Sequence, residues 1–288
     1  MKNISFKLTT LAILFTLIAC DEDNPIPQVS ESEIDDVTAE AYTDYAEDDV
    51  NELVIDLMDD IRLGIGNGQA ANDSNRYRPF AGKVSCADIS ANIENKEIII
   101  DFGAGCESAD GVTRSGKIIV NFTDARHVAG AVITTSFEDF IVNGIGVEGT
   151  RTLTNVSDGS EGQRAFEIKI EEGKITFPDE TFRIISSTKT RTWEIDESTR
   201  EVILTVSGSA EGINRNGEAY IHAIIQDLVY KNSCRRVGTK VAVSGERSIT
   251  KADLTYLISY GNGDCDNAVT ITLPTGEVRE VIVENRRG

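Results

Sequence analysis

The side chains best suited to catalysis are sparse in this sequence. There are two histidines, His127 in the turn-like stretch DARHVAG and His222 in the strand-like stretch AYIHAII. They could form a metal pair only if the fold joins them. Gly-x-Ser-x-Gly, phosphate-loop and His-Glu-x-x-His patterns do not occur in the sequence. Carboxylates are plentiful, so a carboxylate-based hydrolase stays open as an alternative, although no pair stands out. We expect no catalytic residues and a protein that is not an enzyme.

The best ligand candidate is the stretch GNGDCDN. Asn262, Asp264 and Asp266 alternate there, as oxygen ligands do at the start of a calcium loop. Asn267 stands where such a loop needs Gly, and Leu273 stands where it needs Glu. A turn rich in Gly, Asn and Asp after a strand explains the same residues. We therefore expect no cofactor, with Ca²⁺ at these three residues as a weak metal candidate.

Four cysteines remain after the N-terminal one is set aside. Cys86 and Cys106 are centred on a turn at residues 94–96, so they are expected to face each other across one hairpin. Cys234 and Cys265 bracket a second turn in nearly the same way, with a small offset that a bulge would explain. Zinc is disfavoured because no Cys-x₂-Cys spacing occurs. The predicted disulfides are 86–106 and 234–265.

The first twenty residues have the pattern of an export signal. Lys2 and Lys7 precede an apolar run, 8–19, which is too short to span a bilayer. The run ends in Leu17-Ile18-Ala19-Cys20, which resembles the lipobox of bacterial lipoproteins. That resemblance implies that the signal peptide is cut before Cys20, and that both the thiol and the new N-terminus are acylated. Several acyl chains hold a protein on a membrane stably, whereas one does so only marginally.

Three acidic residues, Asp21, Glu22 and Asp23, follow the lipobox directly. They resemble the signal that sends lipoproteins of Bacteroidota to the cell surface. The periplasmic face of the outer membrane is an alternative destination. Retention in the inner membrane is another, because an Asp directly after the Cys has that effect in enteric bacteria. A solvated tether without a sorting role would explain the same residues. We expect an outer-membrane protein that is lipid-anchored at the cell surface.

Charge is distributed unevenly along the chain. The formal net charge is −20, and residues 21–60 carry 16 acidic residues without any Lys or Arg. Residues 61–288 carry 32 acidic against 26 basic residues, so this part is only mildly acidic. The excess next to the proposed anchor would extend a tether. Nucleic acid is a poor partner for such a chain, because affinity for it comes from Lys and Arg neutralising phosphates.

The pattern of apolar residues changes near residue 83. Before it, apolar residues from Ile34 to Ile61 recur at helical spacings, with an acidic opposite face. After it, segments rich in Thr, Ile and Val alternate with period two and are separated by turn residues. The expected organisation is a signal peptide (1–19), an acidic tether (20–33), an amphipathic helix (34–63), a loop (64–82) and a β domain (83–288).

The β domain is predicted to be an antiparallel meander of about ten to twelve strands, as a sandwich or a strongly curved sheet. Residues 98–120 and 256–283 share the order apolar strand, aromatic-Gly-x-Gly, Cys, loop, Gly, apolar strand. We therefore expect two related halves, about 83–160 and 164–288. Together with the lipobox and the acidic helix, this pattern resembles lipoproteins of Bacteroidota, and the resemblance brings no activity with it.

Two functions from different classes fit these features. The first is a non-catalytic surface module that binds or scaffolds a protein or glycan partner. The alternative is a carrier of an apolar ligand in a cavity formed by a curved sheet. A packed core would favour the module, and a hollow inward face of Ile, Val and Phe would favour the carrier.

Overall fold

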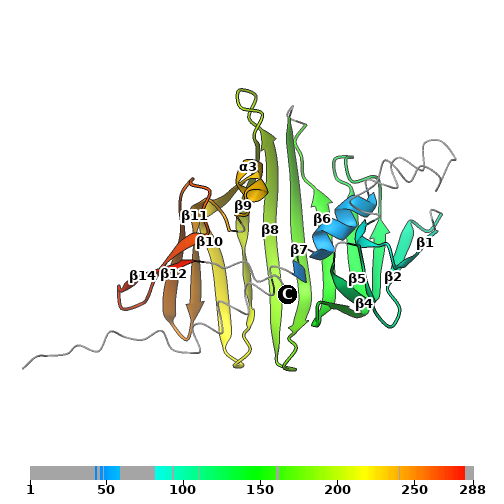
Figure 1. Ribbon diagram of the computed structural model, residues 1–288, viewed down its shortest axis with the longest axis horizontal. Coiled ribbons are helices and arrows are strands. Elements are labelled where there is room, and N and C mark those ends of the chain that lie inside the picture. The colour runs from blue at the N-terminus through cyan, green and yellow to red at the C-terminus, as the bar shows by residue number, and fades with distance from the viewer. Residues whose placement is uncertain are drawn as a thin grey trace, which may run out of the picture.

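A single antiparallel sheet forms the body of the protein. The computed structural model describes residues 43, 46–47, 49–58, 82–92, 94–109, 111–159, 162–239 and 241–282. Within them, thirteen strands follow one another in chain order from β1 to β14, and the short β3 pairs with β4 beside this path. Every pairing is antiparallel. Figure 1 shows the strands side by side in this order, as one open layer.

The fourteen strands confirm the expected meander as one sheet rather than as a sandwich. They exceed the ten to twelve expected because β1, β3 and β13 have only five, two and five residues. The strands are β1 (Asp88–Asn92), β2 (Glu97–Asp101), β3 (Cys106–Glu107), β4 (Thr113–Phe122), β5 (Val132–Val142), β6 (Ile145–Asn155), β7 (Gln163–Thr176), β8 (Phe182–Ile195), β9 (Val202–Ile213), β10 (Ala219–Lys231), β11 (Ser244–Lys251), β12 (Leu254–Asn262), β13 (Ala268–Thr272) and β14 (Val278–Ile282). A short helix, α3 (Asn232–Arg236), lies between β10 and β11.

The alternation of side chains gives the sheet two different faces. On β7, Phe166, Ile168 and Ile170 are buried, whereas Glu167 and Lys169 between them are exposed. Successive residues of a strand point to opposite faces, and residues paired directly across strands share a face. The strand registers therefore place the buried side chains from β2 to the central strands on one face of the sheet, and the opposite face is polar.

A helix covers part of the buried face. Its described residues lie between positions 43 and 58, within the range expected for an amphipathic helix. Ala46, Val50, Leu53 and Leu57 are spaced at three or four residues, so they form one stripe, and each is at most 2% exposed. They share one core cluster with apolar side chains of β2, β4, β5, β6 and β7. Figure 1 shows this helix in front of the sheet near β5 and β6.

Both predicted cysteine pairs are joined by disulfides. Cys86 and Cys106 have Cα atoms 6.0 Å apart, and those of Cys234 and Cys265 are 4.8 Å apart. Each pair lies across the hairpin expected for it, but outside the hydrogen-bonded ladder of that hairpin. The first pair flanks the β1–β2 hairpin from outside its ladder, and the second flanks the β11–β12 hairpin with Cys234 on α3. Each disulfide therefore closes the base of a hairpin, one near each end of the sheet.

Candidate functional site

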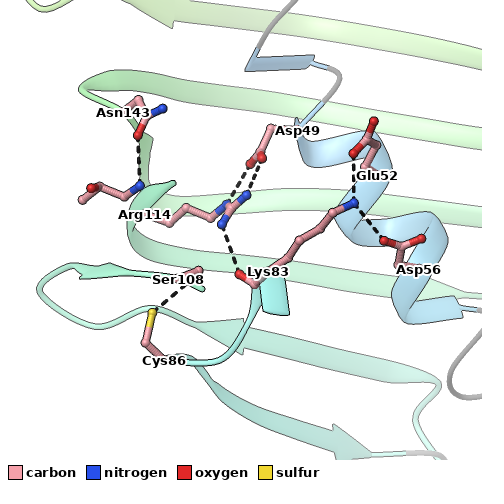
Figure 2. Close-up of polar contacts among 9 residues, drawn as sticks. Asp49, Glu52, Asp56, Lys83, Cys86, Ser108, Arg114 and Asn143 are labelled. Carbon is pink, nitrogen blue, oxygen red and sulfur yellow. Dashed lines mark hydrogen bonds and ion pairs between the residues drawn. The ribbon is translucent and has the colours of Figure 1, made fainter. Parts of the chain in front are cut away.

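The helix is fixed to the sheet by charge as well as by apolar contact. Arg114 on β4 is 1% exposed, and its guanidinium donates hydrogen bonds to both carboxylate oxygens of Asp49 on the helix. It also donates to the backbone carbonyl of Lys83 at 3.1 Å. Figure 2 shows this arginine reaching between the helix and the segment that precedes β1. A buried guanidinium held by a bidentate carboxylate fixes geometry as well as charge.

A second ion pair lies one turn further along the helix. Lys83 Nζ is 2.9 Å from a carboxylate oxygen of both Glu52 and Asp56 (Figure 2). Burial lowers the pKa of Lys83, but the hydrogen bonds and charges of these two carboxylates outweigh it and raise the pKa above its ordinary value. The ammonium is therefore held charged, and it links the helix to the beginning of the β domain.

At the other end of the helix, Glu47 contacts basic side chains of β6 and β8. Its carboxylate lies 3.5 Å from Lys189 Nζ on β8, and its backbone carbonyl accepts a hydrogen bond from Arg151 on β6. Glu47 also lines a small cavity with a volume of about 20 Å³. Such a volume holds roughly one water molecule, whereas ligand pockets measure about 300–1,000 Å³.

Beyond the helix, the same face of the sheet is cationic. The registers of β8 to β14 place six Lys and Arg side chains on the helix-bearing face, and none of the strand positions of β8–β14 that share this face carries Asp or Glu. We call this set the cationic face, and its members are Arg183, Lys189, Arg191, Arg247, Lys251 and Arg279. Between the β8 and β11 members of the cationic face, β9 contributes only the small residues Gly208 and Ala210 next to Lys189 and Ser187.

The two histidines lie apart in the fold. His127 follows β4 in a turn, and His222 is on β10 with its ring centroid 4.8 Å from that of Tyr220. The sheet separates β5 from β10 by five strand spacings, or about 24 Å. In the described part of the chain, no three His, Cys, Asp or Glu side chains are grouped as metal ligands. The fold therefore does not join the histidines into a metal pair.

The calcium candidate lies in the connection from β12 to β13. Asn262 ends β12, and Asp264 and Asp266 are exposed on either side of the disulfide-bonded Cys265. Asp266 accepts a hydrogen bond from a backbone N–H two residues later, as in a local turn. Lys231 Nζ donates to the carbonyl of Gly263 at 2.9 Å, so an ammonium already contacts this loop. Calcium binding here stays a prediction.

Among the described residues, three carboxyls have altered pKa values, and all three are lowered. A hydrogen bond from the Ser198 hydroxyl, followed by backbone N–H donors, lowers the pKa of Asp196 to about 2. Hydrogen bonds from Thr181 lower the pKa of Asp179, and those from Ser233 lower that of Glu201. A general acid for glycoside hydrolysis needs the opposite shift. These three groups serve as turn and helix caps.

The proposed anchor and sorting residues, Cys20, Asp21, Glu22 and Asp23, lie outside the residues that the structure describes. Among those residues, no helix has the length and apolar character needed to cross a membrane. Comparison of the chain with protein-family models, with curated proteins and with solved structures found no match. The functional argument therefore depends on the residues themselves.

Sequence reasoning missed both the buried Asp49–Arg114 pair and the cationic face. The Asp49–Arg114 pair could not be predicted, because no sequence pattern links position 49 to position 114. The second had one: in the β8 stretch TFRIISSTKTRTWEI, Lys189 and Arg191 share the parity of the buried Ile185, whereas the other parity carries Thr. Period two therefore placed these cations on the inner face of the sheet.

Proposed function

We propose that this protein is a lipid-anchored, non-catalytic binding or scaffold module at the outer membrane or the cell surface. The observation that carries the proposal is the pair of disulfides that closes a hairpin near each end of the sheet. Structural disulfides belong to oxidising compartments outside the cytosol. This agrees with the export signal and lipobox that end at Cys20.

The body of the protein suits a scaffold better than a carrier. The helix and β2–β7 enclose one packed apolar cluster, and the cavity beside Glu47 is about 20 Å³. An apolar carrier needs a cavity more than tenfold larger. The open sheet instead presents a broad polar face with rows of hydroxyls, such as those of Thr150, Thr152 and Thr154 on β6.

The anchor is tested by changing Cys20. In a Bacteroidota host, Cys20→Ala is expected to prevent acylation, so the exported protein should leave the membrane fraction and take up no labelled palmitate. Cys86→Ala is the matched control, because it removes a cysteine outside the lipobox and should leave labelling unchanged. Labelled, membrane-bound Cys20→Ala protein would show that the lipobox interpretation is wrong.

Sorting is tested separately. Replacing Asp21, Glu22 and Asp23 by Ala should move the protein from the surface to the periplasmic side, which protease treatment of intact cells reports. The control neutralises Glu31, Glu33 and Asp35, which changes the charge equally but at a distance from Cys20. Equal protease accessibility of both variants and the wild type would show that the acidic run is a tether without a sorting role.

A third measurement separates the scaffold from the carrier. Native mass spectrometry of the protein extracted from membranes should give the mass of the acylated chain alone. A stoichiometric, non-covalent apolar ligand that survives purification would favour the carrier instead.

A further inference from the structure

The two terminal strands of the sheet differ from the others, because each has a neighbour on one side only. In the described part of the chain, β1 pairs with β2 and β14 pairs with β13, and no strand lies beside their outer edges (Figure 1). All five residues of β1 are exposed. An edge of this kind offers N–H and C=O groups to another strand. Both ends of the sheet can therefore accept a further strand.

The hydrogen-bond pattern of β2 identifies which groups of β1 point outward. The residues that flank β2, Lys96 and Phe102, both form backbone hydrogen bonds with β4, so the even-numbered residues of β2 point towards β4. Because backbone groups alternate in direction along a strand, the odd-numbered residues point towards β1. Ser90 pairs with one of these odd-numbered residues. Its neighbours Ile89 and Ala91 therefore direct their N–H and C=O groups to the free edge.

The sequence of β1 is complementary to itself. When two copies run antiparallel about a two-fold axis at Ser90, Ile89 of each copy lies opposite Ala91 of the other, and Asp88 lies opposite Asn92. The outward-pointing groups then face each other, and the two pairs of Ile89 with Ala91 exchange about four hydrogen bonds. Ser90 meets its own copy, which is a favourable hydroxyl pair, and no like charges stand opposite each other.

The apolar side chains fit the same pairing. Ile89 is 43% exposed, although it lies in one row across the strands with the fully buried Ile100 and Ile118. Ala91 lies at the end of the next row, beside the buried Ile98. In the paired arrangement, the row that ends at Ile89 continues into Ala91 and Ile98 of the other copy. Burial of the exposed part of Ile89 against them favours association.

The opposite edge of the sheet fits its own copy less well. Glu277 accepts a backbone hydrogen bond from Leu273 on the β13 side, so Glu280 directs its backbone groups to the free edge of β14. The same pairing centred on Glu280, the middle residue of β14, would place two carboxylates directly opposite each other. Centring it on Arg279 would do the same with two guanidinium groups. Like charges in that position destabilise a strand pair.

We propose that the free edge of β1 is an interaction surface for a second copy of this chain, through antiparallel pairing centred on Ser90. The Cys86–Cys106 disulfide closes the base of the β1–β2 hairpin, so the edge strand is ordered before it pairs, which lowers the entropic cost of association. A two-fold axis normal to the sheet places both helices on one side of the joined sheet and both polar faces on the other. Because only one short strand pairs, the contact is smaller than the roughly 1,000 Å² of stable complexes, and association is weak and concentration-dependent. The pairing depends neither on the proposed anchor nor on the proposed scaffold function.

Cysteine cross-linking of the purified full-length protein tests the register. In Ser90→Cys the two thiols meet at the two-fold axis, where directly opposite Cβ atoms are about 4.5 Å apart, within reach of a disulfide. Mild oxidation should therefore give a 90–90 disulfide, which can only join different copies. Asn92→Cys is the matched control, because position 92 is also exposed but lies about 14 Å from its own copy, and it should give little dimer. Peptide maps of both variants should retain the 86–106 disulfide, which shows that the hairpin is intact.

Blocking the edge then tests whether the backbone makes the contact. Ala91→Pro removes an outward-pointing N–H and leaves the hydrogen bonds between β1 and β2 in place, because Pro is tolerated on an edge strand where the N–H faces solvent. Sedimentation equilibrium of the wild type should show a dimer fraction that rises with protein concentration. Ala91→Pro should lower that fraction several-fold. Glu280→Pro makes the matching change at the free edge of β14 and should leave it unchanged.

Three results would overturn the proposal. The wild type sediments as a single chain at every concentration, or Ser90→Cys gives no more disulfide dimer than Asn92→Cys. Glu280→Cys, at the middle of β14, gives the disulfide dimer in place of Ser90→Cys, which would move the interface to the other end of the sheet. Ala91→Pro leaves the dimer fraction unaltered, or lowers it no more than Glu280→Pro does.

Discussion

One face of this sheet is built in two different ways. Over β2–β7 the helix covers it, and the apolar side chains beneath form one continuous cluster. Over β8–β14 the same face carries the cationic face, and its buried apolar residues include two small clusters, one of Ile185 and Ala210 with Ile170 of β7 and one around Leu228. The strands alternate with the same period in both halves, so both halves place every second side chain on this face. They differ in the residue types found there, which are mostly apolar beneath the helix and include the cations beyond it.

The two halves are nevertheless closed in the same way at their ends. Near each end of the sheet, a cysteine before a hairpin is joined to a cysteine after it. This matches the repeat that relates residues 98–120 to residues 256–283. The ends of the sheet are therefore alike, and the difference arises from the helix that lies on one half.

The largest expected effect comes from the core beneath the helix. Leu53→Ala should lower the free energy of unfolding by about 4 kcal/mol, because Leu53 is fully buried in the large cluster and its removal leaves a cavity. Leu228→Ala, in the small cluster, should cost only about 2–3 kcal/mol, because looser surroundings relax into the space. Denaturant unfolding measures both, and equal losses would contradict the contrast between the halves.

The buried ion pair should have the next largest effect. Asp49→Ala is expected to cost about 3 kcal/mol, because it leaves the guanidinium of Arg114 buried without its carboxylate. Combining Asp49→Leu with Arg114→Met should recover much of this loss. Glu171→Ala, in an exposed pair with Lys169, is the control and should change stability by less than about 1 kcal/mol. A loss of that small size for Asp49→Ala would show that the helix is held by apolar contact alone.

Some elements of the fold can be predicted from the sequence, and others cannot. Long alternating strands such as β7 and β8 are visible from their period, and the turn at 94–96 is visible from its residues. Strand β1, with the sequence DISAN, is not, because it is fully exposed and takes its conformation from pairing with β2. The place of Cys234 on α3 was missed because a five-residue helix leaves no periodic pattern. The Asp49–Arg114 contact depends on tertiary packing across 65 positions, which local pattern does not encode.

Removing each disulfide in turn tests whether the two ends of the sheet are stabilised to a similar extent. Replacing both Cys86 and Cys106 by Ser should cost about 3 kcal/mol, and replacing both Cys234 and Cys265 should cost slightly more, because the second closed loop is longer. Peptide mapping without reduction should recover 86–106 and 234–265 from the wild type. A peptide that joins a cysteine of one pair to a cysteine of the other would contradict the hairpin-closing arrangement.

The two halves should also respond to opposite extremes of pH. The pKa of Lys83 is raised, so its contribution to stability is complete below its ordinary pKa near 10.5 and is lost as pH rises through the higher folded value. The pKa of Asp196 falls from 3.8 to about 2, so its contribution is complete above pH 4 and is lost as pH falls towards 2. Lys83→Met should remove the alkaline dependence and Asp196→Asn the acidic one. Urea midpoints measured across pH report both effects. A variant whose midpoint depends on pH in the same way as that of the wild type would refute the assignment for that residue.

The smallest expected effect compares one hairpin turn from each half. Asn143 and Gly144 join β5 to β6 with φ of 47° and 81°, and Ala252 and Asp253 join β11 to β12 with φ of 47° and 64°. Two-residue turns with positive φ at both positions favour Asn-Gly, which the first turn has and the second lacks. Replacing Ala252 and Asp253 by Asn and Gly should therefore stabilise the protein by about 1 kcal/mol, because side chains in the left-handed region are strained. The reverse change at 143 and 144 should destabilise it by a similar amount. If the first change leaves the urea midpoint unaltered while the second lowers it, the β11–β12 hairpin does not limit the stability of its half.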